Sequence, residues 1–222
     1  MSRIVVIGAH GRTGKLIVDQ LLKAGDNVVA TIRNPKHMAA LVKAGAETVI
    51  LDLDKSTPRD FAVSFTGADA IIFAAGSAEG ESSAIDRKGV TRTVNAAEKA
   101  GVKRYIAISS IGGSTPVPKQ WSAMPGMKEY FAAKKAANKK LRSSTLDWTI
   151  IEPGELTQGK PTGKVTLSTG ALTDEQVSSI KIPRADVAAV AVASLKDKRS
   201  IGKTFQIVGG TTDVAKAIAS AK

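Results

Sequence analysis

Short runs of consecutive apolar residues recur along the chain, and between them apolar residues are spaced three or four positions apart. The short runs are typical of buried strands, and the wider spacing is typical of amphipathic helices. The expected strands cover residues 4–7, 27–32, 47–51, 70–73, 104–108, 148–151, 165–167 and 204–208. The expected helices cover residues 15–22, 35–44, 58–65, 82–100, 127–143 and 184–195, and a last helix follows the final strand. Because strands and helices alternate throughout, we predict a doubly wound α/β fold, with a parallel sheet covered by helices on both faces.

The organisation of the chain favours one domain over residues 1–222. This length fits an α/β domain of ordinary size, and we find no internal repeat. Residues 112–126 are rich in Pro, Gly and Ser, which favours a loop over a binding site rather than a linker between domains. Residues 155–183 are expected to form a small segment on the substrate side.

Three glycines separate the first expected strand from the first helix. Gly8, Gly11 and Gly14 follow the pattern G-x-x-G-x-x-G at this junction. In such a loop the first glycine makes a tight turn, the second lets the backbone approach a pyrophosphate, and the third lets the helix pack closely on the strand. The helix N-terminus adds N–H groups and a positive dipole end. We therefore predict the dinucleotide-binding loop of a Rossmann-type fold, with the side chain of His10 beside the diphosphate.

The residue after the second strand distinguishes the two nicotinamide cofactors. An NAD site usually places Asp or Glu there for the ribose 2′-hydroxyl, whereas an arginine accommodates a 2′-phosphate. This chain has Arg33 at that position, Arg12 in the glycine loop and Lys36 close by. Two guanidinium groups suit charge-assisted hydrogen bonds to one phosphate. We expect NADP(H) rather than NAD(H), and the alternative is that Arg33 is a solvated residue at a strand end.

Composition narrows the chemistry. The chain has no cysteine and two histidines, which excludes disulfides and thiol nucleophiles and disfavours a histidine-based metal centre. It has no apolar run of about 18 residues and no segment that resembles a signal peptide, so we expect a cytoplasmic protein without a membrane partner. The formal charge is +12, but the basic clusters at 134–142 and 196–203 lack interleaved aromatic residues. This favours a solvated face that attracts an anionic cofactor over a nucleic-acid site.

Candidate catalytic residues follow the fifth strand. Tyr130 and Lys134 are four positions apart on an expected helix, so they share one face. A neighbouring ammonium favours the phenolate form of a tyrosine, which suits Tyr130 as the acid for an alkoxide formed during hydride transfer. Lys134 could also hydrogen-bond the nicotinamide ribose. Ser109 and Ser110 emerge where doubly wound folds bind ligands. The alternative is a half-buried tyrosine with a solvated lysine.

At this point the sequence resembles a known family, the atypical short-chain dehydrogenases/reductases of the NAD(P)H-binding, NmrA-like group, which includes bacterial sugar-epimerase-like and flavin-reductase-like proteins. The matching stretches are GAHGRTG (8–14), AGAETVILDLD (44–54), DAIIFAAGS (69–77), GVKRYIAISS (101–110), YFAAKKAANKKLRSSTLDWTIIEPG (130–154) and RADVAAVAVASL (184–195). They cover nearly the whole chain in the family's order.

The resemblance implies a set of site residues. It implies NADP(H) binding through Gly8, Gly11, Arg12, Thr13, Gly14 and Arg33, with Asp52 and Leu53 beside the adenine, Ala74, Ala75 and Gly76 beside the ribose, and Pro153 at the nicotinamide end. It implies that Tyr130, Lys134 and a serine after the fifth strand form the catalytic set. Ser110 is slightly favoured over Ser109, because relatives match either position. Glu152 stands where the family often has arginine, so an anion-facing group is expected to be lost.

The function expected from these residues is an NADPH-dependent oxidoreductase that reduces a small carbonyl, quinone or flavin acceptor. An epimerase that oxidises a sugar transiently would use the same residues, but only about 70 residues follow the sixth strand, which is little for a sugar-nucleotide subdomain. A non-catalytic NADP(H) sensor is the alternative from another class. A monomer or a homodimer fits either reading.

Overall fold

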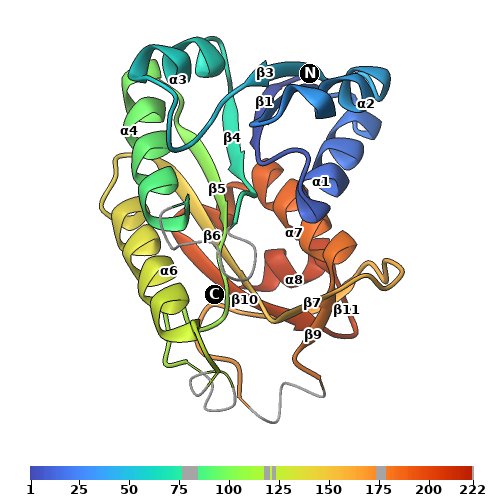
Figure 1. Cartoon of the computed structure of the whole chain (residues 1–222). Coiled ribbons are helices and arrows are strands. Elements are labelled where there is room, and N and C mark those ends of the chain that lie inside the picture. The colour runs from blue at the N-terminus through green and yellow to red at the C-terminus, as the bar shows by residue number, and fades with distance from the viewer. Residues whose placement is uncertain (77–84, 118–120, 122–123, 174–178, 222) are drawn as a thin grey trace.

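The computed structural model describes residues 1–76, 85–117, 121, 124–173 and 179–221, and within them the chain forms a nine-stranded sheet with the order β11-β8-β10-β6-β5-β4-β1-β2-β3 (Figure 1). The strands are β1 (Arg3–Ile7), β2 (Asn27–Ile32), β3 (Glu47–Ile50), β4 (Ala70–Phe73), β5 (Arg104–Ile108), β6 (Asp147–Pro153), β7 (Glu155–Thr157), β8 (Lys164–Ser168), β9 (Lys181–Pro183), β10 (Lys203–Gly209) and β11 (Thr212–Asp213). Strands β7 and β9 pair with each other in a separate two-stranded sheet.

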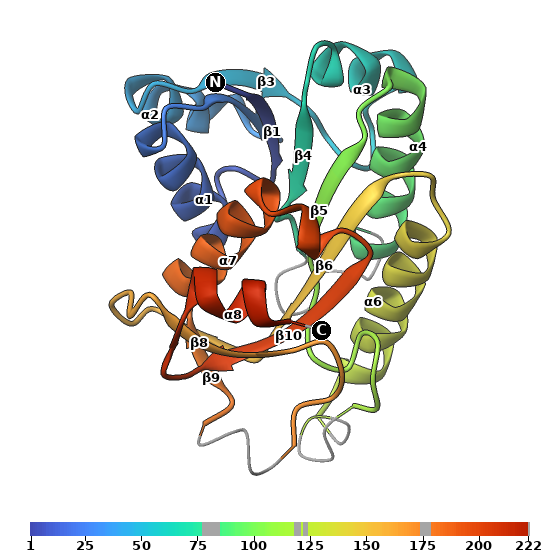
Figure 2. The ribbon, with the colours of Figure 1, turned by 180° about the vertical axis from the view of Figure 1, so that it is seen from behind.

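Helices cover both faces of the large sheet. They are α1 (Arg12–Lys23), α2 (Met38–Lys43), α3 (Pro58–Phe65), α4 (Val90–Ala100), α6 (Met127–Arg142), α7 (Arg184–Lys196) and α8 (Val214–Ser220), with short helical turns η1 (Pro35–His37), η2 (Ile85–Gly89) and η4 (Lys198–Ser200). Residues at alternate positions of β1 face opposite cores: Ile4 and Val6 pack with α1, α2, α7 and α8, whereas Val5 and Ile7 pack with α3, α4 and α6. Figure 2 shows α7 and α8 in front of the sheet on the first of these faces. The fold is therefore the predicted doubly wound α/β type.

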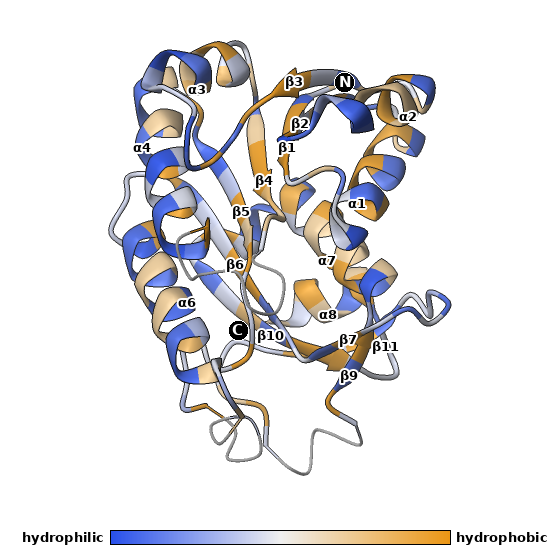
Figure 3. Cartoon of the chain, viewed as in Figure 1, coloured by the Kyte–Doolittle hydropathy of each residue, from blue (hydrophilic) through white to orange (hydrophobic). Residues whose placement is uncertain are grey.

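The apolar pattern of the sequence explains these layers. Strands β1 and β4 are buried along nearly their whole length, and Figure 3 shows them as hydrophobic. The helices α4 and α6 alternate apolar and polar residues, so each buries one face. Local signals set the ends of some helices: Thr57 and Asp60 form a capping box at the start of α3, and Gly101, with φ +74°, ends α4.

The edge of the sheet departs from the all-parallel prediction. Strands β3, β2, β1, β4, β5, β6 and β10 run parallel, but β8 pairs antiparallel with β10 and β11 pairs antiparallel with β8. The connection from β10 to β11 contains only two residues, 210 and 211, and the two strands pair antiparallel with opposite edges of β8. Strands β7 and β11 were not expected, because each is only two or three residues long.

Three further boundaries differ from the prediction. The helix expected at 35–44 begins as the 3₁₀ turn η1 before α2. The strand expected at 148–151 is longer than predicted, because β6 continues to Pro153. Pro153 is the last residue of this strand, and its carbonyl accepts a hydrogen bond from the Ile111 N–H at 3.1 Å. The helix expected at 82–100 is described from Ile85, where it opens with the π-helical turn η2 before α4, and residues 82–84 lie outside the described part. Across the described residues, no helix is both long and apolar enough to span a membrane.

Candidate functional site

The glycine loop between β1 and α1 leaves no room for side chains at two of its glycines. Gly8 has φ +79°, and a Cβ there would lie 2.7 Å from the Cα atom of Ala75 at the end of β4. A Cβ on Gly14 would lie 2.2 Å from the carbonyl oxygen of Gly8. The N-cap of α1, Gly11, provides no side-chain cap, so the first N–H groups of α1 point to the space above the loop. These features fit a diphosphate bound by the backbone.

Cationic side chains surround this loop. Arg12 and Arg33 are both exposed, one at the start of α1 and the other after β2. Arg184, the first residue of α7, was not expected here; its pKa is lowered by burial and by the charge of Arg12, which places the two guanidinium groups near each other. The ring of His10 stacks on His37 with 3.3 Å between ring centroids, and burial, Lys15 and His37 all lower its pKa.

The other predicted cofactor residues lie at the carboxyl edge of the same strands. The N–H of Ala74 donates to the Ile7 carbonyl at 2.9 Å, which holds the end of β4 beside the end of β1, and Ala75 and Gly76 follow. Leu53 is half-buried after β3, and Thr13 is half-buried in the first turn of α1. The structure thus gathers these residues at one edge, and together with the glycine loop they fit a dinucleotide.

Two of the predicted cofactor residues have polar atoms with partners in the protein. The Asp52 carboxylate accepts hydrogen bonds from the N–H groups of Asp54 and Lys55 at 2.9 and 3.2 Å, so it stabilises its own turn. Pro153 is buried at the end of β6, where its carbonyl accepts the bond from Ile111 described above. The predicted place of Asp52 beside an adenine stays a prediction.

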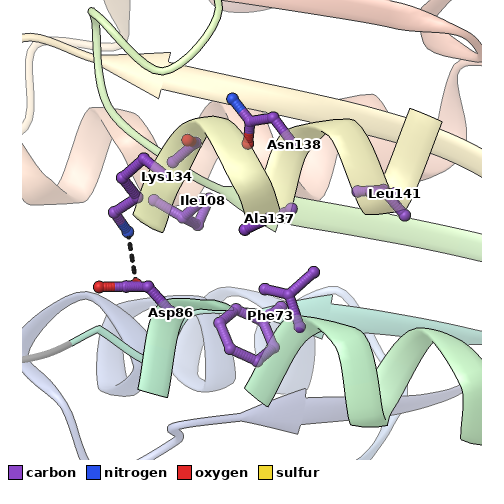
Figure 4. Close-up of a pocket in the computed structure, with 10 residues that line it drawn as sticks. Phe73, Asp86, Ile108, Lys134, Ala137, Asn138 and Leu141 are labelled. Carbon is purple, nitrogen blue, oxygen red and sulfur yellow. Dashed lines mark hydrogen bonds and ion pairs between the residues drawn. The ribbon is translucent and has the colours of Figure 1, made fainter. Parts of the chain in front are cut away.

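Tyr130 and Lys134 lie one turn apart on α6, as predicted. The Lys134 Nζ atom is 5.4 Å from the centroid of the Tyr130 ring. Lys134 is not solvated: its Nζ donates to the Asp86 carboxylate at 2.8 Å, and both side chains are buried (Figure 4). Burial alone would lower the pKa of Lys134, but the electrostatic interactions with Tyr130 and Asp86 and the hydrogen bond to Asp86 outweigh it, so that this pKa is raised. The lysine therefore stays protonated next to the tyrosine.

A small cavity lies beside this ion pair. Its volume is about 10 Å³, close to the space of one water-sized group, and Ser109, Lys134, Asp86 and Asn138 supply its polar lining. Figure 4 shows Lys134 reaching from α6 toward Asp86, which lies on the opposite side. The Ser109 hydroxyl is buried and has no hydrogen-bond partner among the described residues. A buried hydroxyl of this kind is available to a ligand oxygen.

Ser110 lies apart from this cavity. It is half-buried, and its hydroxyl donates to the Ile111 carbonyl at 3.2 Å. Tyr130 is also half-buried and does not line the cavity, although its ring lies beside Lys134. The structure thus groups Ser109, Lys134 and Asp86, with Tyr130 adjacent. The choice between the two serines stays a prediction, and the cavity favours Ser109.

Asp86 was not among the candidate site residues predicted from the sequence, but it forms the ion pair with Lys134. The two residues are 48 positions apart and meet only because η2 and α6 pack together, so the sequence held no signal for the pair. No group of three or more His, Asp or Glu side chains that could hold a metal ion occurs among the described residues.

A backbone cradle at a helix N-terminus, at the carboxyl edge of a doubly wound sheet, defines a dinucleotide-binding protein of the Rossmann class. A sequence model described as NAD(P)H-binding matches residues 8–198, and the chain belongs to that family. It is similar to an uncharacterized sugar epimerase, YhfK, of Bacillus subtilis, with 33% identity over 97% of this chain and 98% of the relative.

Two solved structures are similar in sequence as well as in fold. A protein of Bacillus halodurans, assigned by name to the NAD-dependent epimerases/dehydratases, has 33% identity and a TM-score of 0.87, and the match covers 99% of each chain. The oxidoreductase ylbE of Lactococcus lactis has 31% identity and a TM-score of 0.83, with 98% of this chain and 95% of that chain covered. The described fold and the family agree on nicotinamide-cofactor binding.

Proposed function

We propose that the protein is an NADPH-dependent oxidoreductase of the atypical short-chain dehydrogenase/reductase type, which reduces a small carbonyl, quinone or flavin acceptor. The observation that carries the proposal is the buried, unpartnered hydroxyl of Ser109 in a cavity that it shares with Lys134, next to Tyr130. A site that only bound the cofactor would need neither a free hydroxyl nor a cation held beside a phenol.

Each of these residues has a chemical role in the proposal. Bound NADPH supplies the hydride. The Ser109 hydroxyl donates a hydrogen bond to the acceptor oxygen and holds it in place. Tyr130 gives a proton to that oxygen as negative charge develops, and the Lys134 ammonium stabilises the phenolate that remains. Asp86 keeps Lys134 in position. Residues 155–183 would contribute to the substrate side of the same domain.

Replacing the acid tests the reaction. We expect the purified protein to oxidise NADPH with at least one acceptor from a panel of aldehydes, ketones, quinones and free flavins. Tyr130→Phe should lower the turnover by at least 100-fold, within the range for lost acid catalysis, and leave the dissociation constant for NADPH within about threefold. Lys135→Gln, one position along α6 from Lys134 and exposed, is the matched control and should retain activity. Full turnover in Tyr130→Phe would refute the proposed role of this tyrosine.

The preference for NADP(H) rests on Arg12 and Arg33. Both guanidinium groups are exposed beside the glycine loop, and a guanidinium recognises a phosphate by paired hydrogen bonds. Replacing Arg33 by Asp should weaken NADPH binding by at least tenfold and leave NADH binding nearly unchanged or improved. Equal affinities of the parent protein for NADPH and NADH would contradict the preference.

The epimerase alternative is favoured by the names of two similar proteins, from Bacillus subtilis and Bacillus halodurans. An epimerase oxidises and re-reduces its substrate, so it would not consume NADPH, and it would invert a sugar centre that exchanges hydrogen with the cofactor. Tight NADPH binding without oxidation of any acceptor and without epimerisation would instead support the sensor. The proposal also includes a small-molecule substrate rather than nucleic acid, a cytoplasmic location and a monomeric or homodimeric state.

A further inference from the structure

A second polar pocket lies on the α6 face of the sheet, with Glu152 at its floor. The carboxylate of Glu152 is 0% exposed. It accepts hydrogen bonds from the Asn138 Nδ2 atom at 2.9 Å and the Gln206 Nε2 atom at 3.1 Å, and Ser114 is a further hydrogen-bond partner. A buried carboxylate with this many donors is held in one geometry. The floor of the pocket is therefore fixed by a network of buried hydrogen bonds.

Residues from several elements form the walls of this pocket, which has a volume of about 330 Å³. Ser114 and Thr115 come from the loop after β5, Trp148 from β6, and Thr204 from β10. Gln206 ties the floor to the wall, because its Nε2 atom also donates to the Thr115 hydroxyl at 2.7 Å. The volume falls in the range of small-molecule sites. Hydroxyl groups and one aromatic ring line it, which suits a polar, hydroxylated ligand.

Two cations stand at the rim. The Arg142 guanidinium donates through Nη2 to the hydroxyls of Ser114 and Thr204, and Lys203 lies at the start of β10. Neither side chain has a carboxylate within 4 Å among the described residues, although five other Lys and Arg side chains of this chain pair with Asp or Glu at exposed or partly exposed positions. The rim therefore offers two cations that form no direct ion pair among the described residues, although the Arg142 charge also acts on the Glu152 carboxyl group at the floor.

We infer that this pocket binds a small hydroxylated organic anion, whose carboxylate or phosphate group contacts Arg142 and Lys203 and whose hydroxyl groups face the threonines. A guanidinium recognises either anion by paired hydrogen bonds. The carboxylate oxygens of Glu152 accept hydrogen bonds from Asn138 and Gln206, so the floor already has partners, and the ligand's anionic group is placed at the rim beside Arg142 and Lys203. The pocket is separate from the glycine loop, which lies at the ends of β1 and α1.

The pocket is linked to the cavity of the proposed catalytic site by one side chain. Asn138 lines the cavity that contains Ser109 and Lys134, and it donates to Glu152 in the floor of the second pocket. The inference does not depend on the proposed reaction, because it rests on the pocket alone.

Trp148 provides a direct probe of occupancy. The chain has two tryptophans, so Trp121→Phe leaves Trp148, half-buried in the pocket wall, as the single indole. In this background we would titrate glycerol 3-phosphate and glycerate at constant ionic strength and follow the fluorescence, with glycerol as the neutral control. We expect a saturable change with at least one of the two anions and none with glycerol. The stronger response identifies a phosphate or a carboxylate ligand.

Charge-neutralising variants decide whether the signal comes from this pocket. Arg142→Gln should weaken binding at least tenfold and Lys203→Gln at least threefold, whereas Arg59→Gln, an exposed residue on α3, should leave it unchanged. Lys203→Gln keeps the test valid if Arg142→Gln unfolds, because the Lys203 side chain bridges no other elements. A non-saturable response, an equal response to glycerol, or unchanged binding in both rim variants would overturn the inference. Displacement of the bound anion by NADPH would overturn the inference as well, because it would place the anion at the glycine loop.

Discussion

Lys134 shows how one residue depends on a partner that lies far away in the sequence. The side chains of Lys134 and Asp86 are only 7% and 1% exposed, so neither charge is solvated. Asp86→Asn should destabilise the protein by about 3–5 kcal/mol, because it leaves a buried ammonium without its counter-charge. The double variant Asp86→Asn with Lys134→Met should recover much of this loss. Urea unfolding of the parent and the two variants measures the effect, and a loss below about 1 kcal/mol in Asp86→Asn would contradict it.

Glu152 should make the stability depend on pH in the opposite sense to a paired carboxylate. Burial raises its pKa in the folded protein above the ordinary value of 4.5. The folded state therefore holds this proton more tightly than the unfolded state, and the stabilising contribution is complete below about pH 4.5 and is lost as the pH rises through the folded pKa. Glu152→Gln cannot titrate. The free energy of unfolding of this variant minus that of the parent should therefore increase from pH 4 upward, and a pH-independent difference would refute the shift.

At the scale of elements, the start of α1 is a tight contact between helix and loop. An alanine in place of a helical glycine usually stabilises a helix by about 0.5–1 kcal/mol. Gly14→Ala should do the reverse, because its Cβ would lie 2.2 Å from the Gly8 carbonyl oxygen. We expect a lower melting temperature and weaker NADPH binding, measured by thermal unfolding and fluorescence titration. A higher melting temperature with unchanged affinity would show that the loop can relax.

The sequence predicted the elements better than their partners. The bounds of β2, β4 and β5 follow directly from runs of apolar residues, and α3 from its cap and apolar spacing. The pairing of β8 with β10 did not follow, because short strands near an edge carry little periodicity and their pairing depends on tertiary contacts. Trp148 packs against the core and also lines the second pocket, which the apolar pattern alone does not predict. The glycine loop and Tyr130 could be predicted because local spacing encodes them, whereas Asp86 and Arg184 reach the site only through helix packing.

At the scale of the whole molecule, residues from both ends of the chain lie beside the glycine loop of the proposed cofactor site. Helix α7 packs along α1, and the Gln20 side chain of α1 donates to the Ala185 carbonyl of α7 at 3.1 Å. This contact brings Arg184 near Arg12, although 172 positions separate them in the chain, and it explains why the glycine loop lies among cations from both ends. Helix α7 therefore brings a cation from the C-terminal part of the chain to the proposed cofactor site.

The net charge of +12 should increase the rate at which the cofactor associates with the protein. A positive field attracts NADPH before contact, whereas short-range hydrogen bonds mainly set how long it stays. Raising the salt from about 20 mM to about 500 mM should therefore lower the association rate several-fold, because the Debye length falls well below about 10 Å. The dissociation rate should change less. Arg33→Gln should mainly raise the dissociation rate, and stopped-flow NADPH fluorescence separates the two. An association rate that is independent of salt would mean that the excess charge lies too far from the glycine loop to steer the cofactor.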